Sequence, residues 1–282
     1  MNIRNINLQK TIKELLEFSI INIDKPSGPT SFDVVENVRK ILGARKTGHF
    51  GTLDPKVTGV LPIAINRACK LTDYFMHKDK TYIGKMYIHS DISLENLKKE
   101  MEKFTGEIMQ KPPVKSRVKR VLRPRKVHKF EVLKKDEKVV EFIADVEAGT
   151  YIRKLISDLG EGIRGAHMVE LRRIKAGIFD EKSSVSLKKV EEAFKNYKNG
   201  REDKLRDILI PAEIISEILP VVQIKKDNIK QILTGKPLMK NDLIKNLPDS
   251  EMFAVFSVGR FIEIARKSEE GDIVARAEFV LN

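Results

Sequence analysis

The sequence predicts an α+β fold in which a domain built on a mixed or antiparallel sheet is followed by a small β-barrel. Strand-like and helix-like segments alternate without the regular rhythm of a doubly wound sheet. The chain has 282 residues, which is long for one domain and comfortable for two. Several short strands with one helix follow Pro220, a pattern typical of a small barrel. We therefore expect an N-terminal extension over 1–19, a main domain over 20–217 and a C-terminal domain over 218–282.

The first half of the main domain has clear element boundaries. A short apolar strand over 20–23 precedes an amphipathic helix over 31–42, which opens at Ser31 and is stopped by Gly43. The apolar run 60–65 indicates a buried strand. The next expected elements are a helix over 66–76, a strand over 81–89 and an amphipathic helix over 94–104.

The second half begins with a predicted hairpin, because a charged turn at 134–138 separates two strand-like runs over 127–133 and 139–146. Helical patterns follow over 151–163, 187–196 and 204–217. The C-terminal domain should contain a helix opened by Asp227, a tight turn at 256–260, and strands over 221–224, 252–257, 260–265 and 273–281.

Composition limits the possible functions. Lys and Arg number 53 against 40 Asp and Glu, so the net charge of +13 favours a polyanionic partner, nucleic acid above all. Cys69 is alone and the five histidines lack ligand spacing, which predicts neither a disulfide framework nor a metal site. There is no apolar signal core and no apolar run of membrane-spanning length. We therefore expect a soluble, cytoplasmic protein without a membrane partner.

The segment 48–62 contains the most informative acidic residue. Three glycines and two prolines exclude a regular helix or central strand, so Asp54 should lie on an irregular loop before the buried strand 60–65. Such a loop can hold a carboxylate in a fixed pose at a cleft. Asp-Pro pairs also commonly start turns, so spacing alone leaves a purely structural role for Asp54 open.

Four motifs carry a resemblance to a known family. They are the HxGTLDP motif at 49–55 with TGVLP at 58–62, the IDKPSGPTS motif at 23–31, EAGTYIR at 147–153 and AHMVELRR at 166–173. The sequence is similar to the TruB/dyskerin family of RNA pseudouridine synthases, and LDPKVTGVLP is closer to its archaeal and eukaryotic dyskerin branch. The tail after Pro220 resembles a PUA domain, an RNA-binding module, with a loose match at 233–238.

The resemblance implies an isomerase that converts uridine to pseudouridine without a cofactor or metal. No GxGxxG or Walker loop is present, which agrees with that reaction. At the matching motif positions, the resemblance implies that Asp54 is the catalytic carboxylate and that Arg153 is the ion-pair partner that holds it ionised. Tyr82 matches the tyrosine that stacks under the uracil. Without the family, Tyr82 would be interpreted as a core residue and Arg153 as an ordinary helix-surface residue.

The target base must leave the RNA stack to reach Asp54. The resemblance implies a base-flipping and substrate-binding set of His49, Gly51, Thr52 and Leu171. It also implies that Lys25 and Pro26 support the loop structurally. Phe50 departs from the family pattern, which usually has a small or polar residue there.

A basic segment, Lys111 to Lys129, holds nine Lys or Arg and no acidic residue, and Pro124 should keep much of it irregular. The alternative is a solvated loop without a partner, although crowded like charges favour an anion. A second group of basic residues lies in the AHMVELRR motif. Together the two groups predict phosphate contacts at Lys115, Arg117, Lys119, Arg120, Arg123, Arg125, Arg172 and Arg173.

The implied partners are RNA and, in the dyskerin branch, other proteins. The first hypothesis is the catalytic subunit of an archaeal box H/ACA particle, which acts on rRNA with a guide RNA and three small proteins, and also on the TΨC-loop uridine (uridine-55) of tRNA. A stand-alone tRNA pseudouridine-55 synthase is the alternative. An inactive RNA-binding scaffold is disfavoured by the intact Asp54, Tyr82 and Arg153, and a carboxylate-based hydrolase by the lack of a second matched acid.

Overall fold

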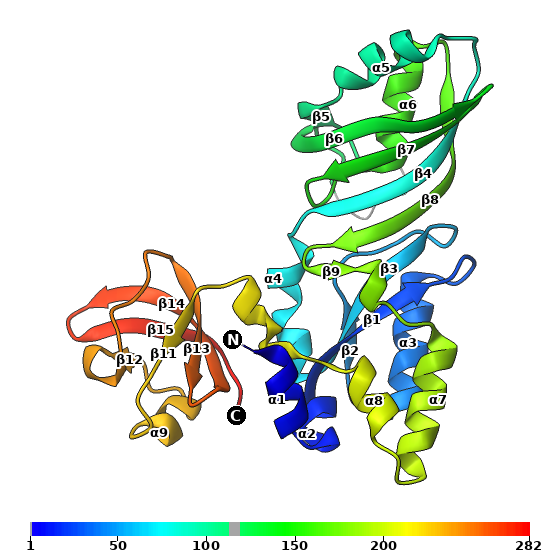
Figure 1. The fold of residues 1–282 in the computed structure, drawn as a ribbon. Coiled ribbons are helices and arrows are strands. Elements are labelled where there is room, and N and C mark those ends of the chain that lie inside the picture. The colour runs from blue at the N-terminus through cyan, green and yellow to red at the C-terminus, as the bar shows by residue number, and fades with distance from the viewer. Residues whose placement is uncertain (1, 113–118) are drawn as a thin grey trace.

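The computed structural model describes residues 2–112 and 119–282 (Figure 1). Its larger sheet is mixed and, within these residues, has ten strands. In sheet order, eight of them are β10 (Ile210–Pro211), β1 (Phe18–Lys25), β3 (Thr58–Asn66), β8 (Ala166–Ala176), β4 (Lys80–Ile88), β7 (Val139–Val146), β6 (Arg123–Asp136) and β5 (Gly106–Gln110). The short strand β2 (Thr47–His49) pairs with β3, and β9 (Phe179–Asp180) pairs with β8. The predicted α+β class is confirmed.

Helices cover parts of this sheet and lie at its ends (Figure 1). The helices of the described chain are α1 (Ile3–Gln9), α2 (Ile12–Glu17), α3 (Ser31–Leu42), α4 (Thr72–Met76), α5 (Leu94–Glu102), α6 (Ile152–Gly162), α7 (Leu187–Lys198), α8 (Asp203–Ile208) and α9 (Ile229–Leu233). Short 3₁₀ turns are η1 (Arg67–Leu71), η2 (Glu181–Ser183), η3 (Ala212–Glu217) and η4 (Lys240–Asp242). Among the described residues, every helix is too short or too polar to cross a lipid bilayer.

Helix α3 has its predicted bounds because its ends are well specified. Thr30 and Asp33 form a capping box: Thr30 Oγ1 accepts from the Asp33 amide, and Asp33 Oδ2 accepts from the Thr30 amide. At the other end Gly43 adopts a φ of 61°, the left-handed cap that glycine tolerates best. The capping box fixes the N-terminus of α3, which lies next to residues 50–57, the loop that carries Asp54 (the Asp54 loop).

The larger sheet has a narrow seam between its two halves. Strand β3 meets β8 through only two parallel pairs, Thr58 with Arg172 and Gly59 with Arg173. Gly59 has a φ of +101°, and a Cβ at this position would lie 2.1 Å from the Arg173 carbonyl oxygen. Glycine is therefore required for the close approach of the two strands. Because β3 begins at Thr58, the Asp54 loop runs directly into this seam.

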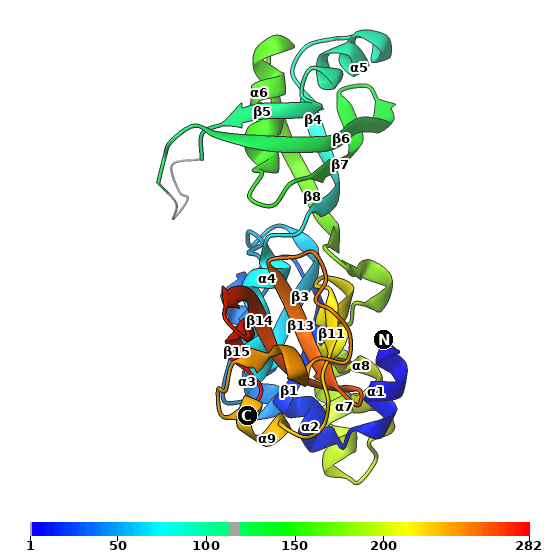
Figure 2. The same cartoon turned by 90° about the vertical axis from the view of Figure 1, so that its left-hand side faces the viewer.

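The C-terminal sheet is a five-stranded half-barrel, in agreement with the predicted small barrel (Figure 2). Its order is β11 (Val221–Gln223), β13 (Met252–Ser257), β14 (Arg260–Glu270), β15 (Ile273–Val280) and β12 (Leu238–Met239). An apolar cluster joins it to the larger sheet, and Phe18 of β1 stacks on Phe261 of β14 with ring centroids 5.3 Å apart. The two sheets therefore pack directly against each other.

Three predictions about elements were wrong. The helix expected over 66–76 is divided into η1 and α4. The helix expected over 204–217 ends at Ile208, because Pro211 forces the preceding residue into an extended conformation and this pair adds a short strand beside β1. Pro124 lies inside β6 rather than in irregular chain. There β6 pairs with β5 alone, so one strand edge is free and a residue without an N–H is tolerated.

Candidate active site

Ser31 anchors the Asp54 loop to helix α3. Its hydroxyl accepts from the Leu53 amide at 2.8 Å and donates to the Leu53 carbonyl at 2.9 Å. Both residues are buried, so water does not compete for these bonds. The residue before Asp54 is thereby fixed to the capped end of a helix.

Lys25 anchors the other side of the same loop. Its side chain is fully buried, and Nζ donates to the carbonyls of Pro26, Pro55 and Val57, each at 2.9 Å. Burial lowers the pKa of Lys25, and the Asp54 carboxylate opposes that shift. Three acceptors compensate for the loss of water around the ammonium group. The position of Lys25 agrees with its expected supporting role.

Arg173 crosses the seam and holds both ends of the loop. Its Nε donates to the Val60 carbonyl at 2.7 Å, and Nη2 donates to the Gly51 carbonyl at 3.0 Å. The residue is only 1% exposed. The prediction that Arg173 contacts an RNA phosphate is therefore wrong, because its guanidinium is committed to the protein interior.

Asp54 and Arg153 come together at the surface end of this clamped loop. Arg153 Nη2 donates to Asp54 Oδ2 at 2.6 Å, across 99 residues of sequence. Arg153 lies in the first turn of α6, so the HxGTLDP and EAGTYIR motifs meet at this ion pair. The side chains are 50% and 48% exposed, so both the pair and the carboxylate are accessible from solvent.

Other predicted residues lie on strands beside the loop. Tyr82 on β4 is 9% exposed and is paired in register with Arg173. Leu171 lies two residues from Arg173 on β8 and is also buried. His49 ends β2, with Nε2 3.4 Å from Thr52 Oγ1. Burial lowers the pKa of His49, and the positive charge of Arg173 adds to that shift. The imidazole is therefore biased towards its neutral form.

Phe50 packs behind the loop. It is buried and stacks on Phe75 with ring centroids 4.7 Å apart and planes 8° from parallel. Phe179 completes this aromatic cluster at 5.9 Å from Phe50. The residue that departs from the family pattern thus fills a local core and stabilises the back of the loop.

A small basic notch lies beside the N-terminus of α6. Gln110 donates to the Tyr151 carbonyl at 3.2 Å and accepts from the Tyr151 amide at 2.9 Å, which ties β5 to the residue before the helix. The notch has a volume of about 80 Å³, and both Arg123 and Arg125 line it. Gly149 gives the Arg125 guanidinium room, because a Cβ there would lie 3.1 Å from Nη2. Two cations of β6 therefore lie near the helix that carries Arg153.

The remaining predicted phosphate contacts differ in their surroundings. Lys119 and Arg120 are exposed, and Arg120 Nε donates to the Pro112 carbonyl at 3.2 Å. Arg172 makes a bidentate ion pair with Asp24, at 2.8 and 3.2 Å, and also contacts Glu181 at 3.1 Å, so two carboxylates neutralise it. Two further predicted contacts, Lys115 and Arg117, lie outside the described residues.

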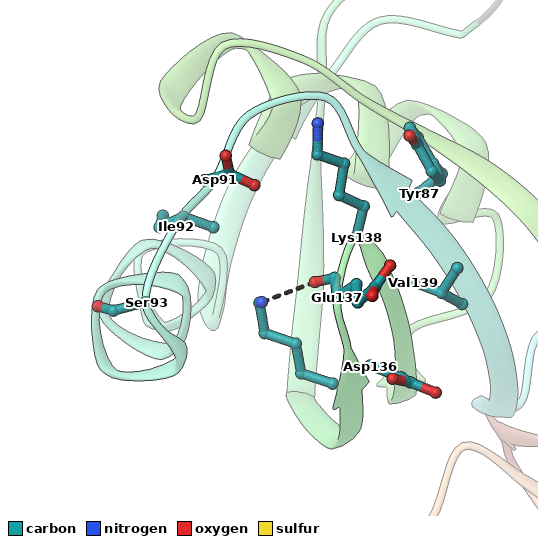
Figure 3. A pocket seen from close by; sticks show the side chains of 9 residues that line it. Tyr87, Asp91, Ile92, Ser93, Asp136, Glu137, Lys138 and Val139 are labelled. Atoms are coloured by element: carbon teal, nitrogen blue, oxygen red, sulfur yellow. Dashed lines mark hydrogen bonds between the residues drawn. The ribbon is translucent and has the colours of Figure 1, made fainter.

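A larger cavity of about 560 Å³ lies at the far end of β4 (Figure 3). Its walls carry both charge signs, and Lys135 Nζ donates to the Glu137 carbonyl at 2.7 Å. Tyr87, which lines it, lies roughly 16 Å along the strand from Tyr82. This cavity is therefore separate from the Asp54–Arg153 pair. Within 2–112 and 119–282, no group of three or more His, Cys, Asp or Glu side chains is placed to hold a metal ion.

Sequence reasoning missed two anchors, Ser31 and Gln110. Ser31 was recognised as a motif residue and helix start, but its bonds to Leu53 join positions 22 residues apart. Gln110 bonds to a residue 41 positions away. No periodicity or local pattern encodes such contacts. The internal direction of Arg173 was missed for the same reason, since a basic run gives no sign of which cation faces inward.

Family models match most of the chain. The TruB family pseudouridylate synthase N-terminal domain matches residues 39–152, the tRNA pseudouridylate synthase B C-terminal domain matches 153–216, and the DKCLD domain matches 6–35. A probable tRNA pseudouridine synthase B of Methanopyrus kandleri is 40% identical over 255 residues, which cover 89% of this chain and 75% of that protein. Its counterpart in Methanocaldococcus jannaschii is 42% identical over 84% of this chain and 71% of that protein.

Solved structures agree with the sequence matches. A structure described as a Cbf5-Nop10-Gar1 complex aligns with a TM-score of 0.88 and 35% identity, over 97% of this chain and 88% of that chain. A structure of an H/ACA RNP bound to a substrate RNA containing 2'-deoxyuridine aligns with a TM-score of 0.87 and 33% identity, over 98% of this chain and 89% of that chain. The motifs, the fold and these relatives together show that the chain belongs to the TruB family of pseudouridine synthases.

Proposed function

We propose that the Asp54–Arg153 pair is the reaction centre of this RNA pseudouridine synthase. In the reaction the uracil leaves C1′ of the ribose, turns, and reattaches through C5, which releases the C5 proton. A carboxylate suits this chemistry because it can attack C1′ or C6 and later leave as a stable anion. The single observation that carries the proposal is the 2.6 Å contact between two motifs that are 99 residues apart in sequence.

The clamped loop supports this assignment. Arg153 orients Asp54 Oδ2 from one side, while Ser31, Lys25 and Arg173 hold the backbone around it. Catalysis depends on placing the reacting group within fractions of an ångström, so a loop fixed at several carbonyls is suited to carry it.

The neighbouring residues take the roles that the family motifs imply. Tyr82 stacks under the uracil and assists removal of the C5 proton. His49, with Gly51, Thr52 and Leu171, receives and holds the flipped nucleotide, which has to leave its stack to reach Asp54. The neutral bias of His49 suits an uncharged wedge between bases. Lys119, Arg120, Arg123 and Arg125 bind the RNA backbone as phosphate contacts.

We further propose that residues 20–217 form the catalytic domain and 218–282 a PUA-like RNA-binding domain, with 1–19 as an extension. The separate five-stranded half-barrel supports the division. The apolar cluster around Phe18 and Phe261 would hold the two domains in one orientation, so that they present a continuous surface to a folded RNA.

For the RNA substrate, we propose rRNA, modified within an archaeal box H/ACA particle that also contains a guide RNA and small protein subunits. Support comes from the alignment over 97–98% of this chain with proteins described in Cbf5-Nop10-Gar1 and H/ACA RNP complexes. The curated relatives are named as probable tRNA pseudouridine synthase B, which favours a second candidate substrate, the TΨC-loop uridine of tRNA. A stand-alone tRNA enzyme is the alternative to the particle.

One experiment separates these substrates. Tritium release from [5-³H]uridine is measured with purified protein alone on a tRNA transcript, and with guide RNA and the small particle proteins on an rRNA fragment. Release from tRNA without a guide, and none from the guided fragment, identifies the stand-alone enzyme. Guide-dependent release from the rRNA fragment supports the particle subunit, and release in both arms supports both substrates. No release in either arm contradicts the assignment of this site as a reaction centre.

A further inference from the structure

We propose that Phe32 stacks on a base of the substrate RNA next to the target uridine and positions the RNA over Asp54. This inference rests on the proposed function of the Asp54 site. It adds a substrate-positioning residue that lies outside the HxGTLDP, EAGTYIR and AHMVELRR motifs.

The exposure of Phe32 is unusual among the aromatic residues. The chain has 13 phenylalanines and 5 tyrosines, all within the described residues, and every other ring is buried or half-buried. Phe32 is 68% exposed. Single exposed apolar side chains are common and need no explanation by themselves. The exposure of Phe32 is informative because of where the ring lies in the structure.

Phe32 lies at the rim of the candidate active site. Ser31 and Leu53 are buried and joined by two hydrogen bonds, and the next residue in each segment is exposed: Phe32 after Ser31, and Asp54 after Leu53. Since consecutive Cα atoms are about 3.8 Å apart, the 2.8 Å contact places the Cα atoms of Phe32 and Asp54 within about 14 Å of each other. A nucleotide adjacent to one bound at Asp54 can span that separation.

The backbone under the ring is rigid. Thr30 and Asp33 close the capping box around Phe32, and the Gly28 amide donates to the Pro55 carbonyl of the Asp54 loop at 2.9 Å. A phenylalanine held on a fixed helix end loses little conformational freedom when it packs against a ligand. The ring is therefore pre-organised as a contact surface.

The chemistry of the rim favours a nucleobase as the partner. Every base has a π face, and base–aromatic stacking is tolerant of sequence, so one ring can serve RNA substrates with different neighbours to the uridine. Lys56, also exposed in the Asp54 loop, supplies a cation for the adjacent phosphate. A protein subunit seated on Phe32 is the competing occupant, and the experiments below distinguish it from RNA.

The first test uses fluorescence, because the chain contains no tryptophan. Phe32→Trp creates a single reporter at the rim, and Leu8→Trp, at an exposed position on α1, is the matched control. Titration with substrate RNA should quench the emission of the Phe32→Trp protein and leave that of Leu8→Trp nearly unchanged. Equal responses in the two variants, or quenching of Phe32→Trp by a protein subunit in the absence of RNA, would overturn the proposal.

The second test uses kinetics and does not depend on a spectroscopic reporter. Phe32→Ala should lower kcat/KM about tenfold, mainly through KM, whereas Phe32→Tyr should retain near-wild-type values because its ring still stacks. Leu8→Ala is the control, and Tm should stay unchanged in all three. An unchanged kcat/KM for Phe32→Ala in an active wild-type background overturns the stacking role alone. A wild type that is inactive both alone on tRNA and in the guided assay on rRNA would instead reject the proposed function.

Discussion

Arg153 holds Asp54 at the surface of the protein. Because both side chains are about half exposed, solvent screens the pair, and its contribution to folding stability is small. In the proposed mechanism the pair matters for orientation, since the Asp54 carboxylate has to meet a flipped nucleotide in one geometry. We therefore expect catalytic and structural effects to separate at this residue.

Arg153→Gln tests that separation. The variant should lower kcat about 100-fold, because the carboxylate is no longer held in its reactive pose, while Tm stays close to wild type. Single-turnover tritium release and thermal unfolding measure the two effects. A kcat within twofold of wild type would mean that Arg153 does not position Asp54.

Glu263 is the second residue with an unusual environment. It lies on β14, paired with Val255 and Val280, and it is fully buried. Neither carboxyl oxygen has a hydrogen-bond partner among residues 2–112 and 119–282. Burial raises its pKa from 4.5 to about 8. An acid of this kind is protonated in the folded protein at neutral pH, whereas it is ionised in the unfolded chain.

The linkage predicts how stability depends on pH. Between pH 4.5 and about 8 the folded state binds the proton and the unfolded state does not, so the free energy of unfolding falls as pH rises. At pH 7 the cost is on the order of 3 kcal/mol, and Glu263→Gln should recover much of it and remove that slope. Chemical unfolding of both proteins at pH 5, 7 and 9 checks this. A slope that is the same in both would contradict the argument.

At the scale of elements, the close contact of β3 and β8 depends on Gly59. Gly59→Ala places a Cβ against the Arg173 carbonyl at a positive φ, so it should destabilise the protein by roughly 2–3 kcal/mol and displace the Asp54 loop. Gly28→Ala is the matched control, because Gly28 has a φ of +113° and no heavy atom of the described residues lies within 4 Å of the added Cβ. Tm and tritium release should fall much further for Gly59→Ala. Similar losses of Tm and activity in both variants would mean that the strain of a positive φ causes the whole effect, and that the contact with the Arg173 carbonyl contributes nothing.

Elements with strong local signals were predictable. Helix α3 carries a capping box and a glycine stop, and β13 is a short apolar run before a tight turn, so their bounds follow from neighbouring residues. Strand β8 was not assigned from its sequence, although the motif within it was recognised. Its polar and charged side chains conceal a strand that gains its stability from long pairing with β4.

At the scale of the whole molecule, the charge of +13 should make RNA binding strongly dependent on salt. Lys119→Ala/Arg120→Ala should weaken binding to all RNA sequences and make the slope of log K against log salt shallower by about one to two. Lys188→Ala/Lys189→Ala removes the same charge from exposed positions on α7. Equal changes in slope for both double variants would mean that the effect is one of net charge and not of local contact.

Motif resemblance predicted more of the site than charge or periodicity did. Motif resemblance gave the Asp54–Arg153 pairing, which the structure realises as a 2.6 Å contact. Most of the contacts that fix the loop around this pair could not be predicted. The excess of basic residues suggested that Arg173 lies at the surface, and no sequence pattern linked Ser31 to Leu53. Such contacts depend on how strands meet at the seam, which is a property of the complete fold.

The most direct test of the central claim is single-turnover tritium release from [5-³H]uridine RNA by wild type and Asp54→Asn, with RNA affinity measured in parallel. The substitution replaces one carboxylate oxygen by an amide on an exposed side chain, so fold and RNA binding should persist. We predict that release falls by roughly three orders of magnitude or more while affinity changes little. Release by Asp54→Asn at a rate near that of wild type would show that the reaction centre lies elsewhere.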